Sequence, residues 1–196
     1  MEMANRVVIL LAVLFLSACT STNSVNLAYK SSATAVPKTQ DAPTITVGNF
    51  VDERGETATW FGAIRGGYGN PLKKLEAAPS VSAAVQSAFK DGLQARGLLS
   101  PTNDGSYQLS GVIKAFDCSQ YVRREAHARI EVHISDKAGK QVFSQTYTAD
   151  ELDGSLLAMN VGIFASVETL RALAEKSLTE VVDKSLDDTA LRNSMH

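Results

Sequence analysis

The sequence predicts an α+β fold in which a mainly antiparallel, four-stranded sheet carries two helices on one face. Two long segments have apolar residues at helical spacing, and four shorter segments alternate apolar and polar residues as half-buried strands do. The expected order along the chain is strand, helix, three strands, helix. Helices with one apolar stripe each and a sheet with one polar face can bury one another as a two-layer sandwich.

The chain begins with an apolar run, Val7–Leu16, which Arg6 precedes and small residues follow. A positive flank, a short apolar core and small residues are typical of a secretory signal. The run is shorter than the roughly 20 apolar residues that a membrane-spanning helix needs. We therefore expect residues 1–18 to be a signal peptide that is removed from the mature chain.

The end of this run, Leu16-Ser17-Ala18-Cys19, resembles the lipobox of bacterial lipoproteins. In that family the cysteine becomes the first mature residue and carries a diacylglyceryl group and usually a third acyl chain such as palmitate. The resemblance implies lipidation of Cys19, and an ordinary signal peptide with an accidental cysteine is the alternative. Three chains at roughly 0.8 kcal/mol per buried methylene anchor a protein without a spanning helix. Thr20, rather than Asp, follows the cysteine, which by resemblance to the sorting rule of two-membrane bacteria implies the periplasmic face of the outer membrane.

Removal of the signal peptide from the 196-residue chain leaves 178 residues with a formal charge of −2, because Glu2 and Arg6 leave together. This length fits one domain and a tether. The slightly acidic balance argues against a nucleic-acid partner, which calls for a basic face. Cys118 is then a lone thiol in an oxidising compartment, and we expect it to be buried, with a redox or intermolecular role as the alternative.

The domain boundaries follow from composition. Residues 19–43 indicate a lipidated cysteine and a flexible tether, because Ser, Thr, Ala, Asn and Pro dominate from Thr20 to Pro43. One α+β domain is expected over 44–188 and a frayed tail over 189–196. The first strand is predicted at Thr44–Val51, where β-branched residues alternate.

The next stretch, 57–72, has neither a helical nor a strand period, and it mixes aromatic residues with glycines. It predicts a long loop, which in a compact domain is usually functional or mobile. A phosphate loop is excluded because the Gly-Lys-Ser/Thr ending is missing. We interpret Trp60, Phe61 and Tyr68 as anchors of a partner or lipid contact in which Arg65 pairs with an acidic group. The alternative is that these aromatic residues fold back over the sheet edge.

Apolar periodicity defines the remaining elements. They are a helix over 79–96, strands over 107–115, 122–135 and 141–149, and a helix over 167–186. Ser80 and Ser166 are the expected helix caps. Residues 136–140 are expected to join the last two strands as a hairpin turn in which Gly139 can adopt a positive φ.

The polar side of the 122–135 strand carries His127 and His133. The two histidines are six positions apart on one strand, which separates them by about 20 Å at 3.3 Å per residue. They cannot share a metal ion, because the ligands of one ion lie within about 2.1 Å of it. A cluster of acids, Asp150, Glu151 and Asp153, indicates a solvated turn. No Gly-x-Ser-x-Gly motif, Cys/His pair or paired carboxylates stand out. We therefore expect no catalytic residue, cofactor or metal, and a protein that is not an enzyme.

Four segments together resemble small envelope lipoproteins of the YajG type and, more loosely, the auxiliary lipoproteins of ABC-type lipid transport systems. They are the lipobox, Val47–Arg54 (Val-Gly-Asn-Phe-Val-Asp-Glu-Arg), the helix Ser82–Phe89 closing at Arg96-Gly97-Leu98, and the strand Leu109–Ile113. The likeness covers about residues 44–186. It implies an α+β accessory domain on the periplasmic side of the outer membrane, which acts through contacts with lipid, glycan or partner proteins.

The first functional hypothesis is a non-enzymatic outer-membrane lipoprotein that serves as an accessory or assembly factor of a cell-envelope complex. It would contact envelope proteins through the 57–72 loop and a sheet edge, and homo-oligomerisation is left open. The alternative is a lipid or small-molecule binding lipoprotein of an envelope transport system. Its ligand would lie between the sheet and the apolar segment 156–164, with Met159, Ile163 and Phe164. That segment could equally pack under the last helix. An enzyme of unknown class is the third reading.

Overall fold

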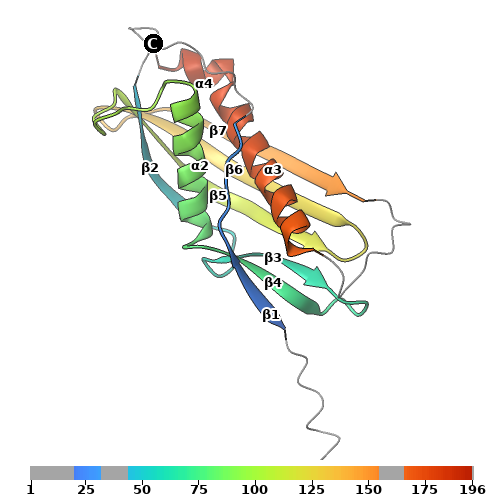
Figure 1. Ribbon diagram of the computed structural model, residues 1–196. Coiled ribbons are helices and arrows are strands. Elements are labelled where there is room, and N and C mark those ends of the chain that lie inside the picture. Colours follow the sequence, from blue (N-terminus) through green and yellow to red (C-terminus); the bar gives the residue numbers. More distant parts are fainter. Residues whose placement is uncertain (1–19, 32–43, 155–165, 196) are drawn as a thin grey trace, which may run out of the picture.

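The computed structural model describes residues 20–31, 44–154 and 166–195. Seven strands form one mixed sheet, and the helices α2 (Val81–Ala95) and α3 (Val167–Leu186) cover one of its faces (Figure 1). A short helix, α4 (Thr189–Asn193), follows α3. The strands are β1 (Ser21–Val25), β2 (Ile45–Asp52), β3 (Trp60–Arg65), β4 (Pro71–Ala77), β5 (Tyr107–Gln120), β6 (Arg124–Asp136) and β7 (Gln141–Asp153).

The long strand β5 organises the sheet. The strand order is β1-β4-β3-β5-β6-β7, and β2 also pairs with β5. Because β2 pairs with residues 107–113 and β3 with residues 118–120, these two strands lie end to end along one side of β5. The pairs β1–β4, β2–β5 and β3–β5 are parallel, whereas β3–β4, β5–β6 and β6–β7 are antiparallel.

The predicted α+β class and the two helices on one face agree with the structure, but the four-stranded, mainly antiparallel sheet is wrong. The predicted loop at 57–72 is instead the hairpin of β3 and β4. A bulge between Trp60 and Gly62 interrupts the alternation of side chains that would have revealed β3. Gly62 is required where β3 meets β5, because a Cβ atom there would lie 2.4 Å from Cys118 Sγ.

The prediction of a flexible tether is wrong for residues 21–31. β1 pairs in parallel with β4, from Ser21 opposite Lys73 to Val25 opposite Ala77. An edge strand is held by backbone hydrogen bonds on one side, so a polar stretch such as Ser-Thr-Asn-Ser can form it without apolar alternation. Residues 32–43 lie outside the described residues, as does the apolar segment 156–164.

The frayed tail predicted at 189–196 is also wrong for the residues that the structure describes. Asp188 caps α4 by accepting a hydrogen bond from Ala190 N. Leu191 and Met195 are buried in the same core as the two long helices. This short helix escapes a periodicity search because five residues contain little more than one turn.

The two long helices are confirmed with their caps. Ser80 accepts a hydrogen bond from the backbone N of Ala83, and Ser166 caps α3 in the same way. On the face toward the sheet, the ring of Phe89 stacks on that of Phe50 in β2 with centroids 4.8 Å apart. Cys118 on β5 is buried as expected, and this burial raises the pKa of its thiol.

Candidate functional site

The four residues predicted to bind a partner lie on β3 and the turn after it, and the structure separates them. Phe61 is fully buried, with its ring 5.8 Å from that of Phe116, so it belongs to the core and does not form a contact surface. Trp60 is half-buried at the start of the strand. Arg65 donates a hydrogen bond to a backbone carbonyl of the turn, and Tyr68 at its tip is fully exposed. Cys19 lies outside the described residues.

Arg54, at the end of the Val47–Arg54 motif, fastens three strands together. Its side chain is only 3% exposed and makes two hydrogen bonds of 2.8 Å to the carboxylate of Asp52. It also donates to the carbonyl oxygens of Trp60 on β3, at 2.8 Å, and Phe116 on β5, at 2.9 Å. Hydrogen bonding from Arg54 holds the pKa of Asp52 below its ordinary value. The motif therefore has a structural role at the junction of β2, β3 and β5.

Residues 26–31, which we call the N-terminal strap, continue from β1 and run lengthwise between α2 and α3 (Figure 1). Four side chains at four-residue spacing on α3 hold it, because residues four apart lie on one face of a helix. The contacts, in order, are Arg171 Nη1 to the Asn26 carbonyl at 3.4 Å, Ala28 N to Glu175 Oε1 at 3.2 Å, Lys30 N to Thr179 Oγ1 at 3.3 Å, and Tyr29 OH to Asp183 Oδ1 at 2.5 Å.

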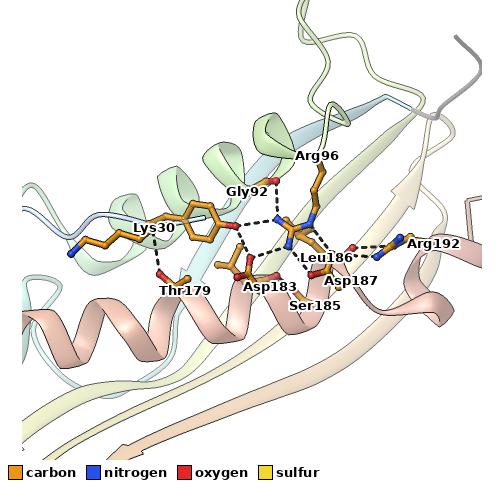
Figure 2. A network of polar contacts seen from close by, with 11 residues as sticks. Lys30, Gly92, Arg96, Thr179, Asp183, Ser185, Leu186, Asp187 and Arg192 are labelled. Carbon is orange, nitrogen blue, oxygen red and sulfur yellow. Dashed lines mark hydrogen bonds and ion pairs between the residues drawn. The ribbon is translucent and has the colours of Figure 1, made fainter. Parts of the chain in front are cut away.

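Arg96 joins the strap to both long helices (Figure 2). Its guanidinium, 6% exposed, makes two hydrogen bonds to Asp187, at 2.9 and 2.8 Å, and one to Asp183 at 2.9 Å. It also donates to the Tyr29 hydroxyl at 3.0 Å. Burial alone would lower the pKa of Arg96, but the hydrogen bonds to Asp187, Tyr29 and Asp183 raise it overall. Burial and the bond to Asp183 raise the pKa of Tyr29.

A row of titratable side chains crosses the sheet on the face away from the helices. Asp117, His127 and Asp150 are neighbours in the register of β5, β6 and β7. His127 Nδ1 lies 2.7 Å from Asp150 Oδ1, and burial raises the pKa of Asp117. His127 is 37% exposed, so the row lacks the exclusion of water that acid–base catalysis uses, and we assign no reaction to it. Within the part of the chain that the structure describes, no group of His, Cys, Asp and Glu could hold a metal ion.

A groove of about 820 Å³ runs beside α2 at the start of β2. Its walls are polar and apolar in equal measure. They come from Val47 on β2, from Ala83, Gln86, Ser87, Lys90 and Gln94 on α2, and from the segment 97–103. Gln86 Nε2 crosses toward β2 and donates to the Gly48 carbonyl at 2.8 Å. Sequence reasoning missed this groove because nothing local to α2 indicates that a strand edge lies beside it.

The outer edge of β2 is open along most of its length. On that side Ile45 makes an isolated bridge to Leu99, and from Val47 to Asp52 the edge has no strand partner among the described residues. Val51, within this stretch, is 54% exposed. An unpaired strand edge presents a row of backbone donors and acceptors to which another chain can add. The groove and this edge together form a surface that can accept an extended polypeptide.

A family model described as an uncharacterized lipoprotein matches residues 32–196. This chain belongs to that family. The resemblance to YajG-type lipoproteins is confirmed, because this is the YajG family. Membership places the chain among envelope-associated, lipid-anchored proteins. No helix in the described ranges has the length and apolar character to cross a bilayer. No curated protein matches this chain.

Several solved structures resemble this fold. The protein XCC0632 from Xanthomonas campestris is 13% identical, and the match covers 88% of this chain and 96% of that one with a TM-score of 0.61. A second crystal structure, of an uncharacterized protein, is 6% identical, and the match covers 89% of this chain and 99% of the other with a TM-score of 0.54. The PelC dodecamer from Paraburkholderia phytofirmans is more distant, with 16% identity, coverages of 74% and 90%, and a TM-score of 0.44. The first two likenesses show a shared fold and nothing further, and the PelC likeness carries no conclusion.

Proposed function

We propose that this protein is a non-enzymatic accessory or assembly lipoprotein of a cell-envelope complex, anchored through Cys19 to the periplasmic face of the outer membrane. It docks an extended segment of a protein partner on the outer edge of β2 and in the adjoining groove. The open edge from Val47 to Asp52, beside a groove of about 820 Å³, is the observation that carries this proposal.

The chemistry of the surface favours a polypeptide. A strand that adds to a sheet edge gains affinity from backbone hydrogen bonds and specificity from pockets for alternate side chains. Val51 offers an apolar contact at the edge, while Gln86, Lys90 and Gln94 offer hydrogen bonds from the helix wall. Sheet edges that natural proteins leave unused are usually covered or charged. No strand covers β2 from Val47 to Asp52 among the described residues, and Gln86 reaches only the Gly48 carbonyl, so the rest of this edge supports a docking role.

Binding of a lipid or small molecule in the same groove is the second candidate. Its volume lies within the range of roughly 300–1,000 Å³ that is usual for ligand sites. Such sites are predominantly apolar and bury most of the ligand. Here the groove is open, and polar side chains such as Ser87, Gln94 and Asn103 make up as much of its lining as apolar ones do, which favours the polypeptide.

The proposal can be tested with a photo-crosslinking amino acid placed in the lipidated full-length chain inside the envelope. Ser87 is exposed and lines the groove, whereas Ala172 is a small, exposed residue on α3 outside it. We expect one discrete protein adduct from position 87 and none from position 172. A second variant, Gln94→Trp, should fill the groove and abolish the adduct.

Equal labelling from positions 87 and 172, or an adduct that survives Gln94→Trp, would remove the groove as the docking site. A labelled lipid in place of a protein adduct at position 87 would favour the second candidate. The anchor is tested separately by Cys19→Ser, which should move the protein from the membrane to the soluble fraction.

A further inference from the structure

The large apolar side chains that remain exposed are concentrated at one end of the sheet. Among the described residues five such side chains are exposed, and four of them, Tyr68, Tyr121, Val122 and Leu152, lie on the turns and strand end that meet there. Their exposed fractions range from 40% for Tyr121 to 101% for Tyr68. Single exposed apolar residues are ordinary, but several on adjacent turns form a patch that calls for a contact.

A hydrogen bond and a strand pairing bring these segments together. The Tyr121 hydroxyl, on the β5–β6 turn, donates to the Gly67 carbonyl on the β3–β4 turn at 3.0 Å. Leu152 near the end of β7 is the register partner of Glu125, two residues beyond the β5–β6 turn. The two turns and the end of β7 therefore form one surface, which we call the turn patch.

The N-terminal strand starts at this same end. β1 is parallel to β4, so Ser21 lies beside the beginning of β4, directly after the β3–β4 turn (Figure 1). The Thr20 hydroxyl donates to the Pro71 carbonyl at 3.0 Å. Consecutive Cα atoms are about 3.8 Å apart. Thr20, the residue to which Cys19 is bonded in the sequence, therefore lies at the start of β4, next to the β3–β4 turn of the turn patch.

The charge of the β3–β4 hairpin suits a surface of anionic head groups. The acids on either side of Leu152 at the end of β7 are each paired with a basic side chain, Glu151 with Lys176 and Asp153 with Arg124. From Arg65 to Leu75 the chain carries Arg65, Lys73 and Lys74 and no acidic residue, although the whole chain has a formal charge of −2. On the β5–β6 turn, the side chain of Arg123 is 42% exposed, and its Nε lies 3.5 Å from Glu125 Oε1. Tyrosine rings and basic side chains are the residues enriched where proteins meet the head-group region of a bilayer.

We infer that the turn patch is a second membrane contact, in which Tyr68, Tyr121 and Val122 enter the head-group region of the bilayer next to the lipidated Cys19. This inference rests on the lipid anchor of the proposed function. The lipid supplies the attachment, and the patch fixes the orientation of the sheet, in which β5 ends and β6 begins at the membrane.

This orientation places the docking groove away from the bilayer. Tyr107, at the start of β5, pairs with Asp136 at the end of β6, and both lie at the end of the sheet opposite the turn patch. Ile45 of β2 is the parallel partner of Tyr107, so the groove beside it lies at that far end. The 13 residues of β6 separate the two ends by about 40 Å at 3.3 Å per residue.

The experiment uses the lipidated full-length chain in phosphatidylethanolamine/phosphatidylglycerol vesicles, with one environment-sensitive fluorophore per protein. The hairpin turns at the two ends of β6 supply matched sites, Val122→Cys on the turn patch and Ala138→Cys on the far turn. Cys118 is buried and the Cys19 thiol would carry lipid, so the added thiol is the one that reacts. Spin-labelled head groups should quench the fluorophore at position 122 several-fold more than at position 138.

Equal quenching at the two sites, or stronger quenching at position 138, would overturn the inference. Flotation of the protein with the vesicles reports the lipid anchor independently, so a failed anchor and a failed patch are distinguishable. A reporter at Leu152→Cys combined with Tyr68→Ser and Val122→Ser provides a second test. Both replaced side chains are exposed, so the fold should persist while quenching at position 152 falls; unchanged quenching there would contradict a role for the patch.

Discussion

Tyr29→Phe is the substitution that most directly tests whether the N-terminal strap is fastened by its polar contacts. The variant keeps the ring and removes one hydroxyl, which donates to Asp183 at 2.5 Å and accepts from Arg96 at 3.0 Å. A hydrogen bond to a charged group contributes about 1.5–3 kcal/mol to stability. Asp183 keeps its bond from Arg96 at 2.9 Å, and water reaches the half-buried site, so we expect the lower end, about 1.5 kcal/mol.

Hydrogen exchange at two backbone amides of the strap measures this loss. The amide of Ala28 donates to Glu175 and that of Lys30 donates to Thr179, so both become free to exchange when the strap opens. A loss of about 1.4 kcal/mol corresponds to a tenfold change in an equilibrium constant. When exchange follows the opening equilibrium, both amides should exchange about tenfold faster in Tyr29→Phe.

Tyr107→Phe is the matched control. Tyr107 is also half-buried, and its hydroxyl makes no hydrogen bond within the described residues. This variant should leave exchange at Ala28 and Lys30 unchanged. Unaltered exchange in Tyr29→Phe, or equal acceleration in both variants, would refute the claim that the hydroxyl at position 29 fastens the strap.

Three further predictions concern the interior of the sheet. Gly62→Ala places a Cβ atom 2.4 Å from Cys118 Sγ, so urea unfolding should show a loss of about 3 kcal/mol, whereas Gly67→Ala, with nothing within 4 Å, should be near neutral. The Cys118 thiol, whose pKa burial raises, should react with an aromatic disulfide reagent only after unfolding; reaction in the folded protein would contradict its burial. Hydrogen bonding to Arg54 lowers the pKa of Asp52 in the folded protein. The Asp52 carboxylate therefore contributes to the free energy of unfolding above about pH 4, and this contribution is lost as the pH falls through the lowered pKa. The unfolding free energy should therefore fall more steeply below pH 4 in the wild type than in Asp52→Asn, and parallel curves would argue against this linkage.

The elements that bury one face with a regular period could be predicted from the sequence. α2 and α3, with caps at Ser80 and Ser166, and the strands β5 to β7 were found where apolar spacing placed them, although β5 and β7 extend further than expected. The hairpin of β3 and β4 was hidden by its bulge and its glycines. Periodicity reports the burial of alternate side chains, and a bulge shifts that alternation by one residue.

The residues of the candidate site also divide into those that the sequence could identify and those that it could not. Tyr68 was identified as a contact residue because an aromatic side chain in a glycine-rich stretch stands out, and it is exposed. Phe61 was chosen by the same rule, but it is buried in the core. The rule failed because composition cannot distinguish an inward from an outward side chain on a bulged strand. Nothing in the order of residues indicates that Tyr29 and Arg96 meet or that β2 has an open edge.

The sequence by itself determined the features that depend on short stretches: the two long helices and the alternating strands that give the sheet one polar face. The signal peptide and lipobox, which also depend on a short stretch, stay predictions. Tertiary structure alone decided that β1 and the strap lie on the domain, that Arg96 joins α2, α3 and residue 29, and that the turns at 66–70 and 121–123 meet near Thr20. The physical reason is that these features depend on backbone hydrogen bonds and buried ion pairs between residues far apart in the chain. Such contacts leave no period in the sequence.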